Sequence, residues 1–112
     1  MKYYYALYMS EELVSKKAQI IEKLEQDKWQ IEPYLIVLAK SEDNHLEYFH
    51  SVLLLQQSIS KEDLFVIGIA NGELGAMELV EKITQEVYDE TKGTDIRNYI
   101  LQRQRAFEEG NV

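Results

Sequence analysis

Three short apolar runs, separated by longer amphipathic segments, set the strongest limit on the fold of this 112-residue chain. The runs cover residues 3–9, 34–39 and 64–70, and they are rich in Tyr, Ile, Val and Leu. These residue types favour β-strands. In the first and third runs both alternating sets of side chains are largely apolar, which indicates strands covered on both faces. We therefore expect a sheet with helices packed against its two sides.

The segments between and after these runs have helical periodicity. Apolar residues recur every three or four positions, and this pattern predicts helices over about 10–28, 72–92 and 94–108, followed by a frayed tail at 109–112. The segment 46–58 fits both periodicities. Leu53, Leu54 and Leu55 with two glutamines favour a helix there, and a short extended piece near 46–49 can precede it.

Strands that alternate with helices predict an α/β fold over residues 1–112, taken as a single domain. We expect a small three-stranded, or four-stranded, mainly parallel sheet with the flavodoxin-like or Rossmann-like strand order 2-1-3 and the first strand at its centre. The alternative is an α+β fold with a mixed sheet, in which residues 46–56 form a hairpin with 34–39. The choice depends on the segment 46–58.

Composition excludes several classes of function. The chain has 20 acidic and 12 Lys or Arg residues, a formal charge of −8, which argues against binding nucleic acid or an anionic membrane. It has no cysteine, so disulfides, thiolate metal sites and a cysteine nucleophile are excluded. Its apolar runs are far shorter than the ~20 residues that span a bilayer. With no signal-peptide pattern visible, we expect a cytoplasmic protein of bacterial style, with no cofactor and no metal.

A ligand pocket is expected where parallel strands end. In open parallel sheets, ligands bind at the carboxyl ends of the strands. The polar residues that follow the three apolar runs are Ser10, Lys40, Ser41, Asn71 and Gly72. Helix caps, a turn and a solvated loop are the more ordinary use of these residues, because caps and turns recruit the same residue types. The convergence also requires three parallel strands, and a β ribbon in the middle of the chain would remove it.

The glycines after the third run do not form a phosphate-binding loop. Gly68, Gly72 and Gly75 are spaced G-x-x-x-G-x-x-G, which matches neither the dinucleotide nor the P-loop pattern. Glu73 at the start of the following helix would repel a phosphate. We expect Gly68 instead to allow a helix to approach the strand closely.

Asp43, His45, Glu47 and His50 are the only local concentration of metal-binding or acid–base side chains. The two histidines are five positions apart, so they share neither a helix face nor a strand face. No G-x-S-x-G motif marks a nucleophile elsewhere. We interpret this segment as a polar loop, and an enzyme is the least favoured function.

The C-terminal helix leads to the main functional hypothesis. Its apolar side would need another surface if earlier helices already cover the sheet, and a second copy could supply one. The residues expected at that interface are Tyr99, Ile100, Arg103 and Phe107. The tyrosine-rich strand at 3–8 is a second candidate surface. We therefore expect a non-enzymatic domain that self-associates as a dimer; the alternative is a domain that binds a neutral or cationic small molecule at the strand ends.

Overall fold

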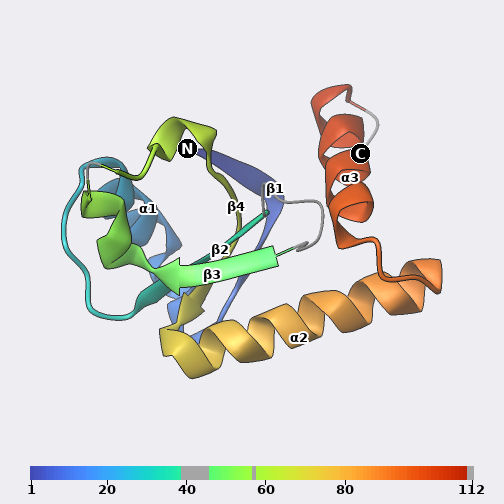
Figure 1. Ribbon diagram of the computed structural model, residues 1–112, viewed down its shortest axis with the longest axis horizontal. Coiled ribbons are helices and arrows are strands. Elements are labelled where there is room, and N and C mark those ends of the chain that lie inside the picture. The colour runs from blue at the N-terminus through green and yellow to red at the C-terminus, as the bar shows by residue number, and fades with distance from the viewer. Residues whose placement is uncertain (39–45, 57, 111–112) are drawn as a thin grey trace.

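A computed structural model describes residues 1–38, 46–56 and 58–110 of the chain (Figure 1). It contains a four-stranded sheet with the strand order β1-β4-β2-β3. The strands are β1 (Lys2–Met9), β2 (Pro33–Leu38), β3 (Leu46–His50) and β4 (Phe65–Asn71). The α-helices are α1 (Lys17–Glu25), α2 (Gly72–Thr91) and α3 (Ile96–Glu108), and the 3₁₀ helices are η1 (Glu11–Lys16), η2 (Ser51–Leu55) and η3 (Lys61–Asp63).

The sheet is mixed, so the expected mainly parallel sheet of order 2-1-3 is wrong. Only β1 and β4 run parallel, and β2 is antiparallel to both β4 and β3. The protein is therefore an α+β fold, the alternative considered above. The first strand lies at the edge of the sheet, and β4 lies between β1 and β2.

β2 forms a hairpin with β3, which replaces part of the helix expected after it. Leu35 pairs with Phe49, and Ile36 pairs with Tyr48. Ile36 and Tyr48 are a β-branched and an aromatic side chain, a type of pair that stabilises neighbouring strands. The helix expected over 46–58 is thus wrong: the extended piece at its start becomes a strand, and the leucine run forms only the five residues of η2. Leu54 is buried in this short turn.

His50 stabilises the junction between β3 and η2. Its Nδ1 accepts a hydrogen bond from the Val52 amide at 2.9 Å, and its Nε2 donates to the Ile31 carbonyl at 2.8 Å. Both ring nitrogens are thereby used by the backbone. The side chain has a structural role at the end of the hairpin.

Two apolar clusters lie on opposite sides of the sheet. Side chains of α2 and α3 pack on one side, with Ile36, Ile67 and Tyr4 of the strands. Side chains of η1, α1 and η2 pack on the other side, with Leu35, Val66 and Ile69 of the strands. Helical cover on both sides of the sheet, as expected from the apolar strands, is confirmed. No helix in the described ranges combines the length and apolar character needed to cross a bilayer.

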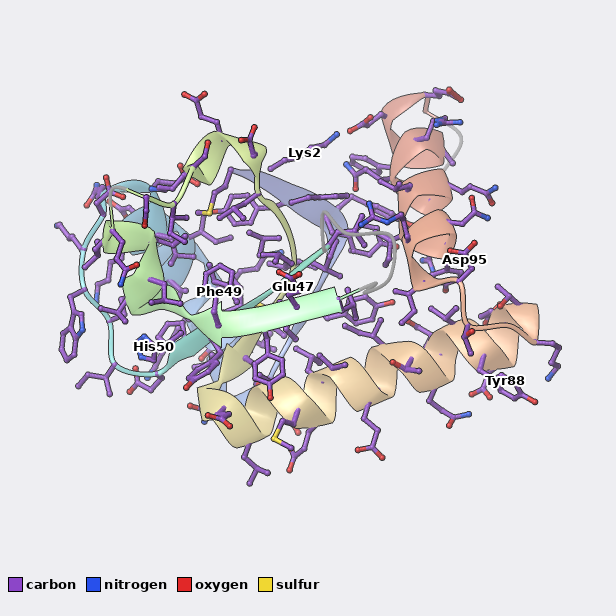
Figure 2. The ribbon with its side chains drawn as sticks, in the orientation of Figure 1. Lys2, Glu47, Phe49, His50, Tyr88 and Asp95 are labelled. Atoms are coloured by element: carbon purple, nitrogen blue, oxygen red, sulfur yellow. The ribbon has the colours of Figure 1, made fainter. Side chains whose placement is uncertain are left out.

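Helix α3 lies beside the first half of β1, the strand at the edge of the sheet (Figure 1). The Gln104 side chain is buried, and its Oε1 accepts a hydrogen bond from the Tyr5 amide at 2.9 Å. The rings of Tyr5 and Phe107 stack with their centroids 4.6 Å apart. Lys2 extends toward the far end of α3 and forms an ion pair with Glu108 at 2.7 Å (Figure 2). Because helices pack on its faces and beside its edge, β1 is apolar on both faces although it is an edge strand. The apolar character of residues 3–9 therefore did not show that this strand is central.

The register between β1 and β4 breaks in the tyrosine-rich stretch. Tyr3 pairs with Val66 and Tyr8 pairs with Gly68, so residues 4–7 of β1 stand opposite Ile67 alone. Such extra residues bend a strand and redirect its side chains. Tyr5, which strict alternation would place with Tyr3, packs instead on the same side of the sheet as Tyr4.

Candidate functional site

Ser10 joins the carboxyl ends of the two parallel strands. The Ser10 amide donates to the Ile69 carbonyl at 3.0 Å, and the Ser10 Oγ accepts from the Asn71 amide at 2.9 Å. Because β1 and β4 are parallel neighbours, the residues that follow them meet at one end of the sheet. The structure thus brings together Ser10 and Asn71, two of the expected pocket residues.

The polar side chains at this end are not used as ordinary helix caps. Ser10 precedes η1 and Asn71 precedes α2, but neither side chain makes a capping hydrogen bond to its helix. Gly72 has the conformation of a turn residue, with φ of +74°, and its amide donates to the Glu32 carbonyl at 3.0 Å. A positive φ suits glycine, so Gly72 has a structural role here.

The convergence of three strand ends is wrong, because β2 runs in the opposite direction. Its carboxyl end at Leu38 therefore lies at the other end of the sheet from Ser10 and Asn71. Lys40 and Ser41 follow this end and lie outside the described residues. The antiparallel hairpin of β2 and β3 removes the third strand end from the expected pocket. Only the ends of the parallel strands β1 and β4 meet.

A pocket of about 450 Å³ opens beside Ser10, between η1 and the first turns of α2. Its lining residues are Met9, Ser10, Glu11, Glu12, Asn71, Leu74, Gly75, Glu78, Leu79 and Lys82. A side chain at Gly75 would approach the Ser10 Oγ at 3.2 Å, so the absence of a side chain lets η1 and α2 lie close together. The formal charges of the lining sum to 1 − 3 = −2.

Two charged residues of the pocket, Glu78 and Lys82, were not expected from the sequence. With Leu74 they are spaced four apart on α2, so all three lie along one side of the helix. The same residues are equally typical of a solvated helix face. One signal could have found them. Leu74, Glu78 and Lys82 follow Asn71 at helical spacing, so a helix that starts at Gly72 places them on the side of Asn71.

The residues expected at a dimer interface lie on α3 and mostly face the chain's own sheet. Ile100 is fully buried in the cluster formed with the sheet and α2. Tyr99 and Arg103 are partly buried. Phe107 stacks on Tyr5 and is 47% exposed.

The histidine and carboxylate segment is only partly described. Asp43 and His45 lie outside the described residues, and Glu47 is exposed on β3. His50 is held by the backbone as described above. Across the part of the chain that the structure describes, no group of three or more His, Asp or Glu side chains is arranged to hold a metal ion.

Comparison with known proteins gave no match: no protein-family model fits the chain, and neither the curated proteins nor the solved structures include one with significant similarity.

Proposed function

We propose that this protein is a binding domain for a small organic cation, such as an amine, and that the pocket beside Ser10 is its binding site. The observation that supports this most is the pocket itself, at the shared carboxyl end of β1 and β4, with three carboxylates and one ammonium group around it. Its volume of about 450 Å³ lies in the range of small-molecule sites, roughly 300–1,000 Å³.

The sign of the ligand charge follows from two opposing effects. The N-terminal turn of α2 reaches the pocket through Asn71 and Gly75, and a helix N-terminus carries the equivalent of about +0.5 charge. Glu11, Glu12 and Glu78 outnumber Lys82 by two full charges. The carboxylates therefore dominate, and a cationic ligand is favoured over an anionic one.

The polar groups of the pocket suit recognition of a short chain with an amine at one end. The carboxylates can pair with an ammonium group, and the Asn71 side chain offers a donor and an acceptor. Leu74, which is 68% exposed, gives an apolar surface for a methylene chain. The domain would act by binding the ligand, with no chemical step.

A substitution in the pocket tests this proposal. We expect 1,4-diaminobutane to bind and to raise the melting temperature, whereas the uncharged 1,4-butanediol should do neither. Glu78→Gln should weaken binding about fivefold, since one exposed charge contact is worth up to about 1 kcal/mol. Isothermal titration calorimetry at low salt would measure both effects.

Glu81→Gln is the matched control for this experiment. Glu81 lies on the same helix, is exposed and does not line the pocket. Both substitutions remove one negative charge, so they change the net charge of the protein equally. Equal weakening by the two substitutions would show a general charge effect and no site. Binding of the diol as tightly as the diamine would also contradict the proposal.

Self-association through α3 stays a weaker alternative. Leu101 and Phe107 expose 39% and 47% of their side chains, so some apolar surface is left on this helix. Light scattering coupled to size-exclusion chromatography would detect a dimer, and Phe107→Glu would be expected to dissociate it. A cytoplasmic location stays a prediction of the sequence.

A further inference from the structure

Arg103 lies at the centre of a cluster of tyrosines between β1 and α3. Its Nε and Nη2 donate to the Tyr5 Oη at 3.3 and 3.1 Å, and its Nη1 donates to the Tyr99 Oη. The guanidinium carbon lies 5.1 Å from the centre of the Tyr99 ring and 6.0 Å from that of the Tyr5 ring. Two phenols from different elements thus fix the position of one cation.

The positive charge of Arg103 has no carboxylate partner among the described residues. Its hydrogen bonds go to tyrosine hydroxyls, which bring no formal charge when protonated. The hydrogen bond with Tyr5 is the main cause that raises the pKa of Arg103, and a guanidinium is charged in proteins in any case. Guanidinium has five N–H groups and these bonds use three, which leaves two for another acceptor.

Tyr4 lies beside this cluster, with its ring centroid 5.1 Å from that of Tyr5. Its side chain is only 2% exposed, and its hydroxyl has no hydrogen-bond partner in the described part of the protein. Burial raises the pKa of Tyr4, and the charge of Arg103 acts in the opposite direction. An ordered water commonly satisfies a buried hydroxyl of this kind, and Tyr4 is not among the residues that line the pocket described next.

Arg103 and Tyr99 also line a pocket of about 470 Å³ at the junction of α2 and α3. Thr94, Asn98 and Gln102 add hydrogen-bonding side chains to its wall. Asp95 lies at the start of α3 (Figure 2), and its carboxylate accepts a hydrogen bond from the Asn98 amide at 3.1 Å as the helix cap. The pocket therefore has an oriented cation on one side and a capping carboxylate on the other.

We propose that this pocket binds a small molecule through a carboxylate group, and that Arg103 is the residue that binds the carboxylate. The two N–H groups that the tyrosines leave free can donate to carboxylate oxygens. Asp95 and the net charge of −8 oppose a doubly charged phosphate more than a singly charged carboxylate. Tyr99 lines the pocket beside Arg103, so an aromatic acid can add a ring contact to the ion pair.

The test uses benzoate as the probe, with benzyl alcohol and inorganic phosphate for comparison. In ¹H–¹⁵N spectra of the intact chain, benzoate should shift the Arg103 Nε–H signal and the amides of residues 91–103, whereas benzyl alcohol should not. Arg103→Gln should weaken benzoate binding at least tenfold, since hydrogen bonds to charged groups are the strong ones. Arg103→Lys, which keeps the charge but loses the planar fork, should weaken it by a smaller factor.

Arg105→Gln is the matched control, because Arg105 is exposed on the same helix and does not line the pocket. It should bind benzoate as the unchanged chain does. If Arg103→Gln does not fold, the spectra of the unchanged chain still decide: benzoate shifts at residues 91–103 would support the site, and their absence at millimolar benzoate would overturn it. Equal shifts with phosphate would contradict the preference for a carboxylate.

This site is independent of the pocket beside Ser10, which favours ligands of opposite charge. Glu78→Gln should therefore leave benzoate binding unchanged, and Arg103→Gln should leave diamine binding unchanged. Each proposal can then fail without the other.

Discussion

Ile100→Ala is expected to lower the free energy of unfolding by about 2–5 kcal/mol, the usual range for truncating a fully buried Ile. Ile100 has no exposed surface and packs in the cluster that joins α3 to the sheet. Its loss leaves a cavity beneath the helix, because its rigid neighbours close it only in part. Urea unfolding followed by circular dichroism would measure the change.

Leu101→Ala is the control for this prediction. Leu101 is the next residue of the same helix and is 39% exposed, so its truncation should cost less than about 1 kcal/mol. The difference should not depend on protein concentration, since the contacts of Ile100 lie within one chain. A small loss for Ile100→Ala, or a loss that disappears at high concentration, would mean that this side of α3 packs on a second copy instead.

Gly68→Ala is expected to destabilise the protein by about 2–3 kcal/mol, in the upper part of the range for overpacking. A Cβ at this position would lie 3.2 Å from the Tyr8 carbonyl oxygen, 3.2 Å from Leu79 Cδ2 and 3.3 Å from Ile36 Cδ1. Leu79 and Ile36 can rotate, but the Tyr8 oxygen belongs to the neighbouring strand. Room for the new methyl group requires β1 or α2 to move away from β4.

Gly93→Ala gives the comparison, because a Cβ there would meet only Thr91 Oγ1, at an ordinary 3.6 Å. This substitution should change the free energy of unfolding by less than about 1 kcal/mol. Alanine lowers the conformational entropy of the unfolded chain, and this effect favours the folded state. Thermal unfolding of the two variants under the same conditions would decide. Equal stability of the two would show that the approach of α2 to β4 is looser than the distances indicate.

Local sequence patterns predicted the elements well. The apolar runs at 3–9, 34–39 and 64–70 form β1, β2 and β4 with ends shifted by one residue at most, and the helices expected over 72–92 and 94–108 are α2 and α3. These elements depend on periodicity and propensity within one segment. The close packing expected at Gly68 is present as well.

The strand directions could not be predicted in the same way. They depend on pairing between separate segments of the chain, because β2 pairs antiparallel both with β3, a strand of five residues, and with β4. A run of leucines at 53–55 favours a helix by propensity, but pairing of Phe49 and Tyr48 with β2 decides the outcome. The same limit applies to the site: Ser10 and Asn71 follow from the ends of two strands, whereas Glu78 and Lys82 join them only through the tertiary position of α2.

The arrangement of α3 along β1 also limits how the sheet can grow. Gln104 occupies the Tyr5 amide, so a strand from another molecule has no access to hydrogen bonds there. The opposite margin ends in β3, whose outer side is the place for a further strand within the described part of the fold. Covering a strand at the margin of a sheet is one of the means by which proteins prevent their sheets from aggregating edge to edge.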